Sequence, residues 1–177
     1  SKIANLGDTL FIIGQTKDEL GGSEYFHATS RSEYGKVPMV DLDIDKKNGL
    51  AVLTLIHKGL INFAHDCSKG GIGIALAELA ISSNLGIDID LERIPNNCKR
   101  HDHLLFSESH SRFIIGTNEA DKVKRILKTR NCAFSEIGKV DGTRTLNLRD
   151  SGDQIIELTV SDLDKAYNTM SKIMDGS

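Results

Sequence analysis

The chain has no tryptophan, only two prolines in 177 residues and 5% aromatic residues in all. A hydrophobic core built from it must therefore consist mainly of Ile, Leu, Val and Ala. An excess of charge is also missing, because the net charge is −3. A general nucleic-acid binder needs a basic surface to neutralise phosphates, so we expect no nucleic-acid partner.

Cysteines and long apolar runs are scarce as well. The three cysteines, Cys67, Cys98 and Cys132, are widely spaced and form no CxxC pair, which is typical of reduced thiols in a cytosolic protein. No apolar run approaches the ~20 residues that span a membrane, and the N-terminus has no signal-peptide pattern. The sequence thus predicts a soluble, cytoplasmic protein without a membrane partner.

What the sequence does have is the composition of a globular domain. It is 39% hydrophobic and 27% charged, the usual balance of a chain that buries a core. Its length fits one domain, and it contains no internal repeat or clear linker. We therefore predict a single domain over residues 1–177, ordered over about residues 5–172.

Apolar patterns predict alternating strands and helices. A buried strand over Asp8–Gly14 precedes a long loop that holds a short helix near Ser23–His27. Leu50, Leu53 and Ile56 recur at a helical spacing and predict a helix over about residues 43–59. Further strands are predicted over residues 61–64, 87–91, 113–116, 134–140, 145–148 and 155–160. Further helices are predicted over residues 72–80, 118–130 and 161–170.

The order of these elements predicts an α/β (α+β) fold, a mixed sheet with helices on its faces. Within it, Asp141-Gly142 is expected to join two neighbouring strands as a tight turn. Asn118 is expected to cap one helix, and Ser161 with Asp164 resembles a capping box for the last helix. Residues 95–103 are expected to be a polar excursion.

The first candidate site is the glycine turn His65–Gly71, between a strand and a helix. Glycines let the backbone approach a ligand closely, and the helix-start amides favour anions. Asp66 could hold Mg²⁺ or accept from a ligand hydroxyl. Alternatively, Asp66 or Ser68 only caps the helix. Cys67 could be a nucleophile, although a free cysteine is more often a small buried hydrophobe.

The second candidate site is the polar run Ser107–Arg112 between two apolar segments. Such a run must be exposed or hydrogen-bonded internally. Arg112 could bind phosphate or carboxylate with two hydrogen bonds, and Glu108 could orient it or a metal. His110 could act as a general base, but a structural hydrogen-bonding role is the more usual one.

Two further patterns are less specific. The Gly21-Gly22 pair precedes a short helix that Ser23 could simply cap, but a second glycine turn makes a shared anion cleft more plausible. His101-Asp102-His103 has the look of a metal site, yet no further Cys or His ligand set accompanies it. A solvated loop is the alternative reading for that segment.

Several of these strings together resemble a known family. The strings are Gly7–Gly14, Leu20–Tyr25, Tyr34–Pro38, Asp41–Asp43, His65–Gly71 with Ala75–Glu78, Phe106–Phe113 and Ile137–Val140. In this order they resemble the second AIR-synthase-type C-terminal module of phosphoribosylformylglycinamidine synthase II. The resemblance spans nearly the whole chain from about Gly7.

The resemblance implies an α/β/α sandwich with a mixed sheet, and an ATP-dependent ligase of purine biosynthesis as the whole enzyme. ATP would phosphorylate the amide oxygen of formylglycinamide ribonucleotide, and glutamine-derived ammonia would then form the amidine. Implied cofactors are ATP and Mg²⁺ in the full enzyme, with ADP or phosphate in this domain. Implied partners are an N-terminal ferredoxin-like module of the same enzyme, a glutaminase subunit and a small accessory subunit.

In this family the catalytic residues lie upstream, so the resemblance implies no catalytic residue here and an inactive chain when alone. It implies an auxiliary phosphate- or nucleotide-binding cleft and a metal role for Asp66. The residues assigned to that cleft are Gly21, Gly22, Ser23, Ser68, Lys69, Gly70, Gly71, Glu108, Ser109, His110, Ser111 and Arg112. The alternatives are another enzyme of the superfamily, such as aminoimidazole ribonucleotide synthetase, selenophosphate synthetase or the hydrogenase maturation type, or a non-catalytic docking module.

Overall fold

The structure, a computed structural model, describes residues 3–29 and 35–174, with side chains described as far as residue 169. The strands are β1 (Thr9–Ile13), β2 (Phe63–Asp66), β3 (Gly86–Asp90), β4 (Phe113–Thr117), β5 (Phe134–Asp141), β6 (Thr145–Asp150) and β7 (Asp153–Thr159). The helices are α1 (Glu24–Ala28), α2 (Leu42–His57), α3 (Gly71–Ser83), α4 (His101–Phe106), α5 (Ala120–Thr129) and α6 (Val160–Met174), with a 3₁₀ turn over Leu91–Arg93.

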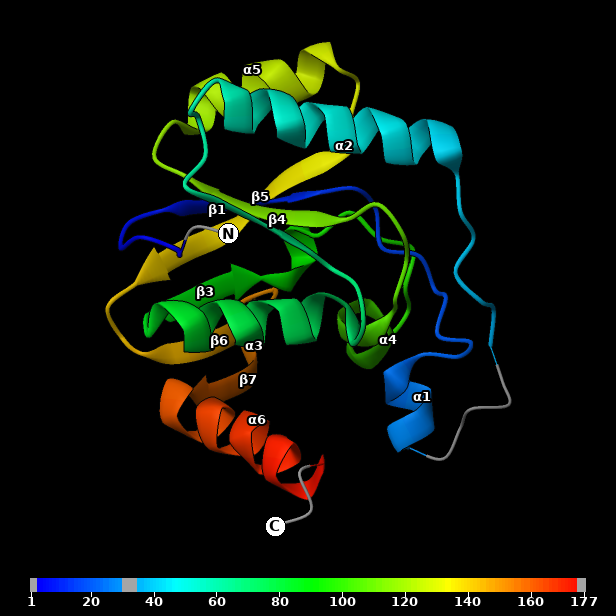
Figure 1. Ribbon diagram of the computed structural model, residues 1–177, viewed down its shortest axis with the longest axis vertical. Helices are drawn as coiled ribbons and strands as arrows, with labels where there is room; N and C mark the ends of the chain where they lie inside the picture. The colour runs from blue at the N-terminus through cyan, green and yellow to red at the C-terminus, as the bar shows by residue number, and fades with distance from the viewer. Residues whose placement is uncertain (1–2, 30–34, 175–177) are drawn as a thin grey trace.

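The seven strands form one mixed sheet in the order β2-β4-β1-β5-β3-β6-β7. Neighbouring strands are antiparallel except β3 and β6, which are parallel. Helices α2 and α5 cover one face of the sheet, and α3, α4 and α6 lie on the other side (Figure 1). The predicted mixed α/β (α+β) sandwich is therefore confirmed.

Strand β1 shows how the sequence produces the two layers. Leu10 and Ile12 belong to the core under α3 and α4, whereas Phe11 and Ile13 belong to the core under α2 and α5. Successive strand residues point to opposite faces, and all four side chains are fully buried. Each such burial contributes about 1.5–3 kcal/mol, so β1 stabilises both layers of the fold.

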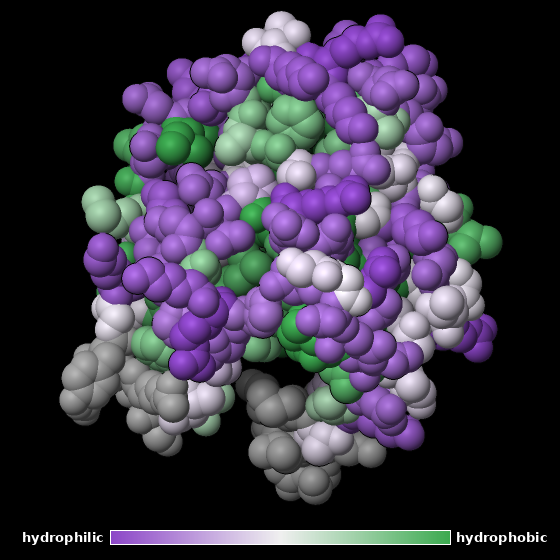
Figure 2. Space-filling model, turned by 180° about the vertical axis from the view of Figure 1, so that it is seen from behind, coloured by the Kyte–Doolittle hydropathy of each residue, from purple (hydrophilic) through white to green (hydrophobic). Residues whose placement is uncertain are grey.

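Hydrophilic side chains cover most of the outer face seen in Figure 2, where hydrophobic ones form separate patches. In the described ranges, no helix is long and apolar enough to span a membrane. All seven strands share one sheet, which favours the predicted single domain. The expected ordered range includes residues 30–34, which lie outside the described residues, as do residues 175–177.

Two expectations about strand and helix content are wrong. The Asp141-Gly142 turn does not join neighbouring strands, because β3 pairs with both β5 and β6 and lies between them. The antiparallel neighbours that follow each other directly are β6 and β7. The polar excursion predicted at residues 95–103 runs into helix α4, which begins at His101.

Two helix starts differ by one or two residues from the sequence prediction. The residue that precedes α5 as its N-cap is Glu119 rather than Asn118, and Thr117 Oγ1 accepts a hydrogen bond from the Glu119 N–H. Before α6, the reciprocal capping pair is Thr159 and Asp162, instead of the expected Ser161 and Asp164. Only before α6 does the predicted chemistry, a hydroxyl paired with an aspartate, recur, two residues earlier in the chain.

One end of the sheet gathers the segments singled out by sequence. Ile13 at the end of β1 and Asp66 at the end of β2 both pair with Phe113 at the start of β4. Because β4 is antiparallel to both neighbours, the two outgoing strands and the incoming one meet at this end. The loops after β1 and β2 and before β4 are therefore brought together.

Candidate functional site

Three candidate segments converge on the carboxylate of Glu108. Its Oε1 atom accepts hydrogen bonds from the backbone N–H of Gly70 and of Glu24, both at 2.9 Å. Lys69 Nζ lies 3.1 Å from Glu24 Oε1 and forms an ion pair. Residues next to both glycine turns therefore lie beside the Ser107–Arg112 run.

The start of α3 depends on glycine. Gly71 has φ +66°, and a Cβ atom there would lie 2.5 Å from the carbonyl oxygen of Ser107 and 2.6 Å from that of Leu105. No other residue fits so close a backbone approach. The N-cap is Gly70, which has no side chain to cap the helix. Glu108 supplies that cap from another loop, so neither Asp66 nor Ser68 is the cap.

The capping by Glu108 changes how the anion site must be understood. Helix-start amides favour anions because they carry partial positive charge. Here a protein carboxylate already accepts from the Gly70 N–H. A phosphate at this place would have to share or displace the Glu108 oxygen.

A pocket of about 570 Å³ opens beside this junction. It falls within the ~300–1,000 Å³ range of small-molecule sites. The exposed residues Asp66, Ser68, Lys69 and His110 all line it. We call it the loop pocket; its lining residues are Pro38, Asp66, Cys67, Ser68, Lys69, Glu108, Ser109, His110, Ser111, Arg112 and Phe113.

Arg112 does not present its guanidinium to a ligand as the sequence suggested. The residue is 1% exposed. Its Nε donates to the carbonyl of Ser109, its Nη2 to the carbonyl of Ser107, and its Nη1 to Thr16 Oγ1. Burial lowers the pKa of this guanidinium. Arg112 therefore holds the loop in shape from inside, and the structure assigns it a positioning role.

Ser109 has a similar structural role. Its Oγ accepts from the backbone N–H of Lys17 at 3.0 Å, and the Oγ of Ser107 donates to the Lys17 carbonyl at 2.6 Å. Both serines are buried. They fix the loop after β1 against the Ser107–Arg112 run, leaving Glu108 and His110 on the outer side.

The first glycine pair contributes indirectly. Ser23 Oγ accepts from the Phe26 N–H and caps α1, as the simpler reading of the sequence proposed. Gly22 and Ser23 line a different pocket, of about 270 Å³, with Glu24 and His27. Gly21 packs against the backbone of Gly35 and Lys36. Tyr34, in the same family string as Pro38, lies outside the described residues.

Sequence reasoning missed Glu24, which joins both other segments through its backbone N–H and its carboxylate. The available signal was its place directly after the helix cap Ser23, where first-turn amides have no partner within the helix. Pro38 and Phe113, which line the loop pocket, were also missed as site residues. Neither has a chemical group that marks a site in sequence.

Cys67 lines the loop pocket but is a poor nucleophile. It is 5% exposed, and burial raises the pKa of its thiol to about 12. The thiolate is the reactive form of cysteine, and almost none is present near neutral pH. The reading of Cys67 as a small buried hydrophobe is supported.

The carboxylates of the loop pocket could hold Mg²⁺ only together with a bound phosphate. Mg²⁺ is commonly held by one or two carboxylates together with phosphate oxygens and water. Asp66 is exposed, and Glu108 Oε2 accepts no hydrogen bond within the described residues. No group of three or more His, Cys, Asp or Glu that could hold a metal occurs in that part of the chain. Asp66 as a metal ligand stays a prediction that requires a phosphate beside it.

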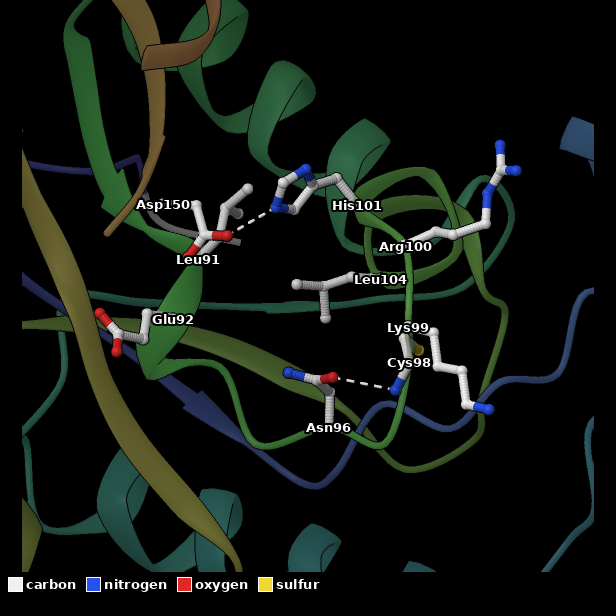
Figure 3. A pocket seen from close by; sticks show the side chains of 9 residues that line it. All are labelled: Leu91, Glu92, Asn96, Cys98, Lys99, Arg100, His101, Leu104 and Asp150. Atoms are coloured by element: carbon white, nitrogen blue, oxygen red, sulfur yellow. Dashed lines mark hydrogen bonds and ion pairs between the residues drawn. The ribbon is translucent and has the colours of Figure 1, made fainter. Parts of the chain in front are cut away.

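The His101-Asp102-His103 segment is not arranged as a metal site. His101 Nε2 lies 2.6 Å from Asp150 Oδ2, whereas His103 Nδ1 lies 2.7 Å from Asp18 Oδ1. The two histidines thus pair with different carboxylates. Figure 3 shows the pocket of about 220 Å³ beside His101, in which Lys99 and Arg100 point away from the His101–Asp150 pair.

A family model and curated relatives both match most of this chain. The family described as AIR synthase related protein, C-terminal domain, matches residues 5–151. The phosphoribosylformylglycinamidine synthase subunit PurL of Methanocaldococcus jannaschii is 39% identical over 91% of this chain. That of Methanococcus aeolicus is 40% identical over 98%. The chain spans only 22% and 23% of those two relatives.

Solved structures share the fold. Thermotoga maritima PurL complexed with FGAR has a TM-score of 0.80 at 23% identity and covers 92% of this chain, which spans 29% of it. The complex of PurL with ATP has a TM-score of 0.77, also at 23% identity over 92%, and this chain spans 26% of it. A HypE–HypF complex is less similar, with a TM-score of 0.63 at 19% identity over 88% of this chain, which spans 53% of it.

Proposed function

Because the chain belongs to the AIR synthase related protein, C-terminal domain, family, we propose that it is the C-terminal domain of a phosphoribosylformylglycinamidine synthase. The observation that carries the proposal is the 39–40% identity to PurL subunits over 91–98% of the chain. The other enzymes of the superfamily are less well supported, since the HypE–HypF complex and a thiamine-monophosphate kinase have lower TM-scores of 0.63 and 0.57.

The whole enzyme would be an ATP-dependent ligase of purine biosynthesis in the cytoplasm. It would use ATP to activate the amide of formylglycinamide ribonucleotide, and ammonia from glutamine would give the amidine. This chain would supply part of the scaffold of that enzyme and an auxiliary nucleotide site, without a catalytic residue of its own. The ATP, ADP and AMPPCP complexes of T. maritima PurL support nucleotide binding in the wider protein.

Within this chain, the loop pocket is the proposed nucleotide-phosphate site. Lys69 is exposed and its ion pair with Glu24 is open to solvent, so it can turn toward a phosphate at little cost. The exposed carboxylate of Asp66 would be the ligand that this pocket offers to Mg²⁺. Bound Mg²⁺ would neutralise phosphate charge next to Asp66 and Glu108, which would otherwise repel the ligand.

The proposed partners follow from the same assignment. They are an N-terminal ferredoxin-like module of the same enzyme, a glutaminase subunit and a small accessory subunit. A structure of PurLQS from T. maritima is among the similar ones, which supports an assembly with further subunits.

The test of the loop pocket is an NMR titration of the ¹⁵N-labelled chain with ADP, with and without Mg²⁺. We expect saturable shifts at residues 66–71 and 108–112 at millimolar ADP, stronger with Mg²⁺. Lys69→Ala should weaken binding in both conditions. Asp66→Asn should remove the gain from Mg²⁺ and leave or improve binding without it, because one negative charge is gone.

Matched controls are available on the exposed surface. Lys58→Ala and Asp153→Asn remove the same charges from positions that do not line the loop pocket, and they should leave both titrations unchanged. An absence of shifts in the two segments at millimolar ADP with Mg²⁺ would reduce the loop pocket to a set of structural turns.

A further inference from the structure

Ser111, which lines the loop pocket, has an unusual backbone conformation. Its φ is +64°, in the left-handed region that is unfavourable for a residue with a Cβ atom. Such a conformation persists only where neighbouring groups hold it. Elsewhere in the described chain, positive φ outside glycine occurs only at helix ends and in the turns between strands, at Asn84, Asn131, Arg144 and Ser151.

The carbonyl oxygen of Ser111 is held by contacts from two different elements. Asn48 of α2 donates to it from Nδ2 at 3.0 Å. Gly14, directly after β1, packs against the same oxygen so closely that a Cβ atom on Gly14 would lie 2.4 Å from it. Asn48 therefore supplies the hydrogen bond to this carbonyl, and the glycine supplies the space for it.

Asn48 is an unusual residue for its position in the helix. It is 1% exposed and shares the inner face of α2 with Ala51, Val52 and Leu55. A buried polar side chain costs stability unless it is hydrogen-bonded, and the bond to Ser111 is the one that the Asn48 side chain makes within the described residues. An apolar residue would avoid that cost, so the loop that contains Ser111 explains the asparagine better than the core does.

The loop is anchored on both sides of this position. Ser109 Oγ accepts from the Lys17 N–H, and the buried guanidinium of Arg112 is bonded within the fold. Only His110 and Ser111 lie between these two anchors. A change in the φ of Ser111 must therefore be taken up by His110, which is exposed and lines the loop pocket.

We propose that Asn48 is a positioning residue of the loop pocket. Its hydrogen bond to the Ser111 carbonyl keeps Ser111 in the left-handed conformation and so fixes His110 at the wall of the pocket. The proposal rests on the nucleotide-phosphate role proposed above for this pocket. Asn48 is not among the residues that line the loop pocket, so it acts on a ligand there only through Ser111.

The experiment compares the ¹⁵N-labelled 177-residue chain with its Asn48→Leu variant, which keeps a side chain of similar size and removes the donor. A positive φ gives a strong intraresidue NOE between the amide and α protons, so NMR reads the Ser111 conformation directly. We expect this NOE to weaken in Asn48→Leu. The half-saturating concentration of ADP with Mg²⁺ should rise about tenfold, because the left-handed form falls to roughly a tenth of the population.

A glycine at position 111 separates positioning from a simple loss of stability. Glycine adopts positive and negative φ about equally, so in a Ser111→Gly background the Asn48→Leu change should raise the half-saturating ADP concentration by no more than about twofold. The matched control is Val52→Ala on the same buried face of α2. It loses apolar packing and should lower stability while leaving the Ser111 NOE and the ADP titration unchanged. Asn48→Ala is the second variant if Asn48→Leu fails to fold.

Three results would overturn this proposal while leaving the proposed function in place. One is an Asn48→Leu chain that keeps the Ser111 NOE. Another is an Asn48→Leu chain that loses the NOE but binds ADP as the unmodified chain does. The third is an equal loss of ADP affinity with serine and with glycine at position 111. An unmodified chain without ADP shifts would instead contradict the proposed function, and the pocket role of Asn48 with it.

Discussion

Arg112 lies in the interior with its guanidinium bonded to the loop that carries Glu108. The three acceptors are the carbonyl oxygens of Ser107 and Ser109 and the hydroxyl of Thr16. Two of them are local, but Thr16 follows β1 and is 96 residues away in sequence. One side chain thus joins the loop after β1 to the loop before β4.

We expect Arg112→Met to lower the free energy of unfolding by about 2–4 kcal/mol, because buried acceptors would lose their charged donor. Methionine keeps much of the apolar length, so the change reports mainly on the hydrogen bonds. Urea unfolding followed by circular dichroism gives the value.

The matched control for this prediction is Arg93→Met. Arg93 also pairs through its Nε, but with Asp90 at an exposed position, and exposed ion pairs contribute less than about 1 kcal/mol. If both variants lost the same small amount, Arg112 would not organise the loop.

The direction of Arg112 could not be predicted from sequence. The polar run Ser107–Arg112 had to be either exposed or internally bonded, and it is both. Ser107, Ser109 and Arg112 are buried, while Glu108 and His110 face outward. The pattern of side chains alone does not reveal that carbonyls of the same loop turn inward to receive a guanidinium. That arrangement depends on Thr16, which only the fold brings near.

Helix α4 illustrates the same limit at the scale of elements. It has six residues, and isolated helices this short are not stable. Contacts distant in sequence hold it. The Tyr25 ring of α1 stacks on Phe106 with ring centroids 4.8 Å apart, and the Tyr25 hydroxyl donates to Asp102 Oδ2. Local pattern predicted strands and long helices well, but neither this helix nor the place of β3 between β5 and β6.

The contact between α1 and α4 should depend on pH. The pKa of Asp102 lies well below its usual range, chiefly because Arg100 donates hydrogen bonds to it, and also because Tyr25 does. The unfolded value is about 3.9. A lowered folded-state pKa gives stability that is fully present above the unfolded value and is lost as pH falls through the folded one.

We therefore expect amide protection of α1 to fall between about pH 5 and pH 2 in the unmodified chain. In the Asp102→Asn variant, amide protection of α1 should already be low at pH 5 and should fall little further as the pH is lowered. Hydrogen exchange read by mass spectrometry measures both. Helix α5, on the other side of the sheet, is the internal reference, and an equal loss there would point to global unfolding instead.

At the scale of the whole molecule, the notable surface is the outer side of α2. The spacing of Leu50, Leu53 and Ile56 correctly predicted a helix, but these side chains are 43%, 43% and 50% exposed. The face turned to the core consists of Asn48, Ala51, Val52 and Leu55. Hydrophobic periodicity predicts an apolar helix face but does not say what covers that face. Helix α2 has two apolar faces, one buried against the sheet and one exposed.

Under the proposed function, we expect the rest of the synthase to cover the exposed face of α2. The relatives at 39–40% identity are over four times as long as the matched segment, which is 22–23% of their length. Val37, Met39 and Val40, each more than half exposed, precede the helix and extend the apolar surface. Leaving so much apolar surface in water is unfavourable, and a domain of the same enzyme is the occupant that the coverage favours.

The last prediction concerns activity of the assembled enzyme. Under the proposed function, the 177-residue chain alone should form no amidine from formylglycinamide ribonucleotide, ATP and ammonia, because it spans only 22–23% of the length of its relatives. Adding the remaining part of a PurL subunit as a second chain should restore activity. Leu53→Glu should prevent this by placing a charge in the α2 interface. Leu158→Glu on β7, at a matched 42% exposure, should leave the restored activity intact.

Activity of the chain alone would refute its role as one part of the enzyme. Equal activity of the two variants would show that α2 does not lie in the interface. The second chain supplies the upstream residues in every reaction, so a loss confined to Leu53→Glu, in a variant whose circular dichroism spectrum and urea midpoint match those of the unmodified chain, would assign α2 to the interface.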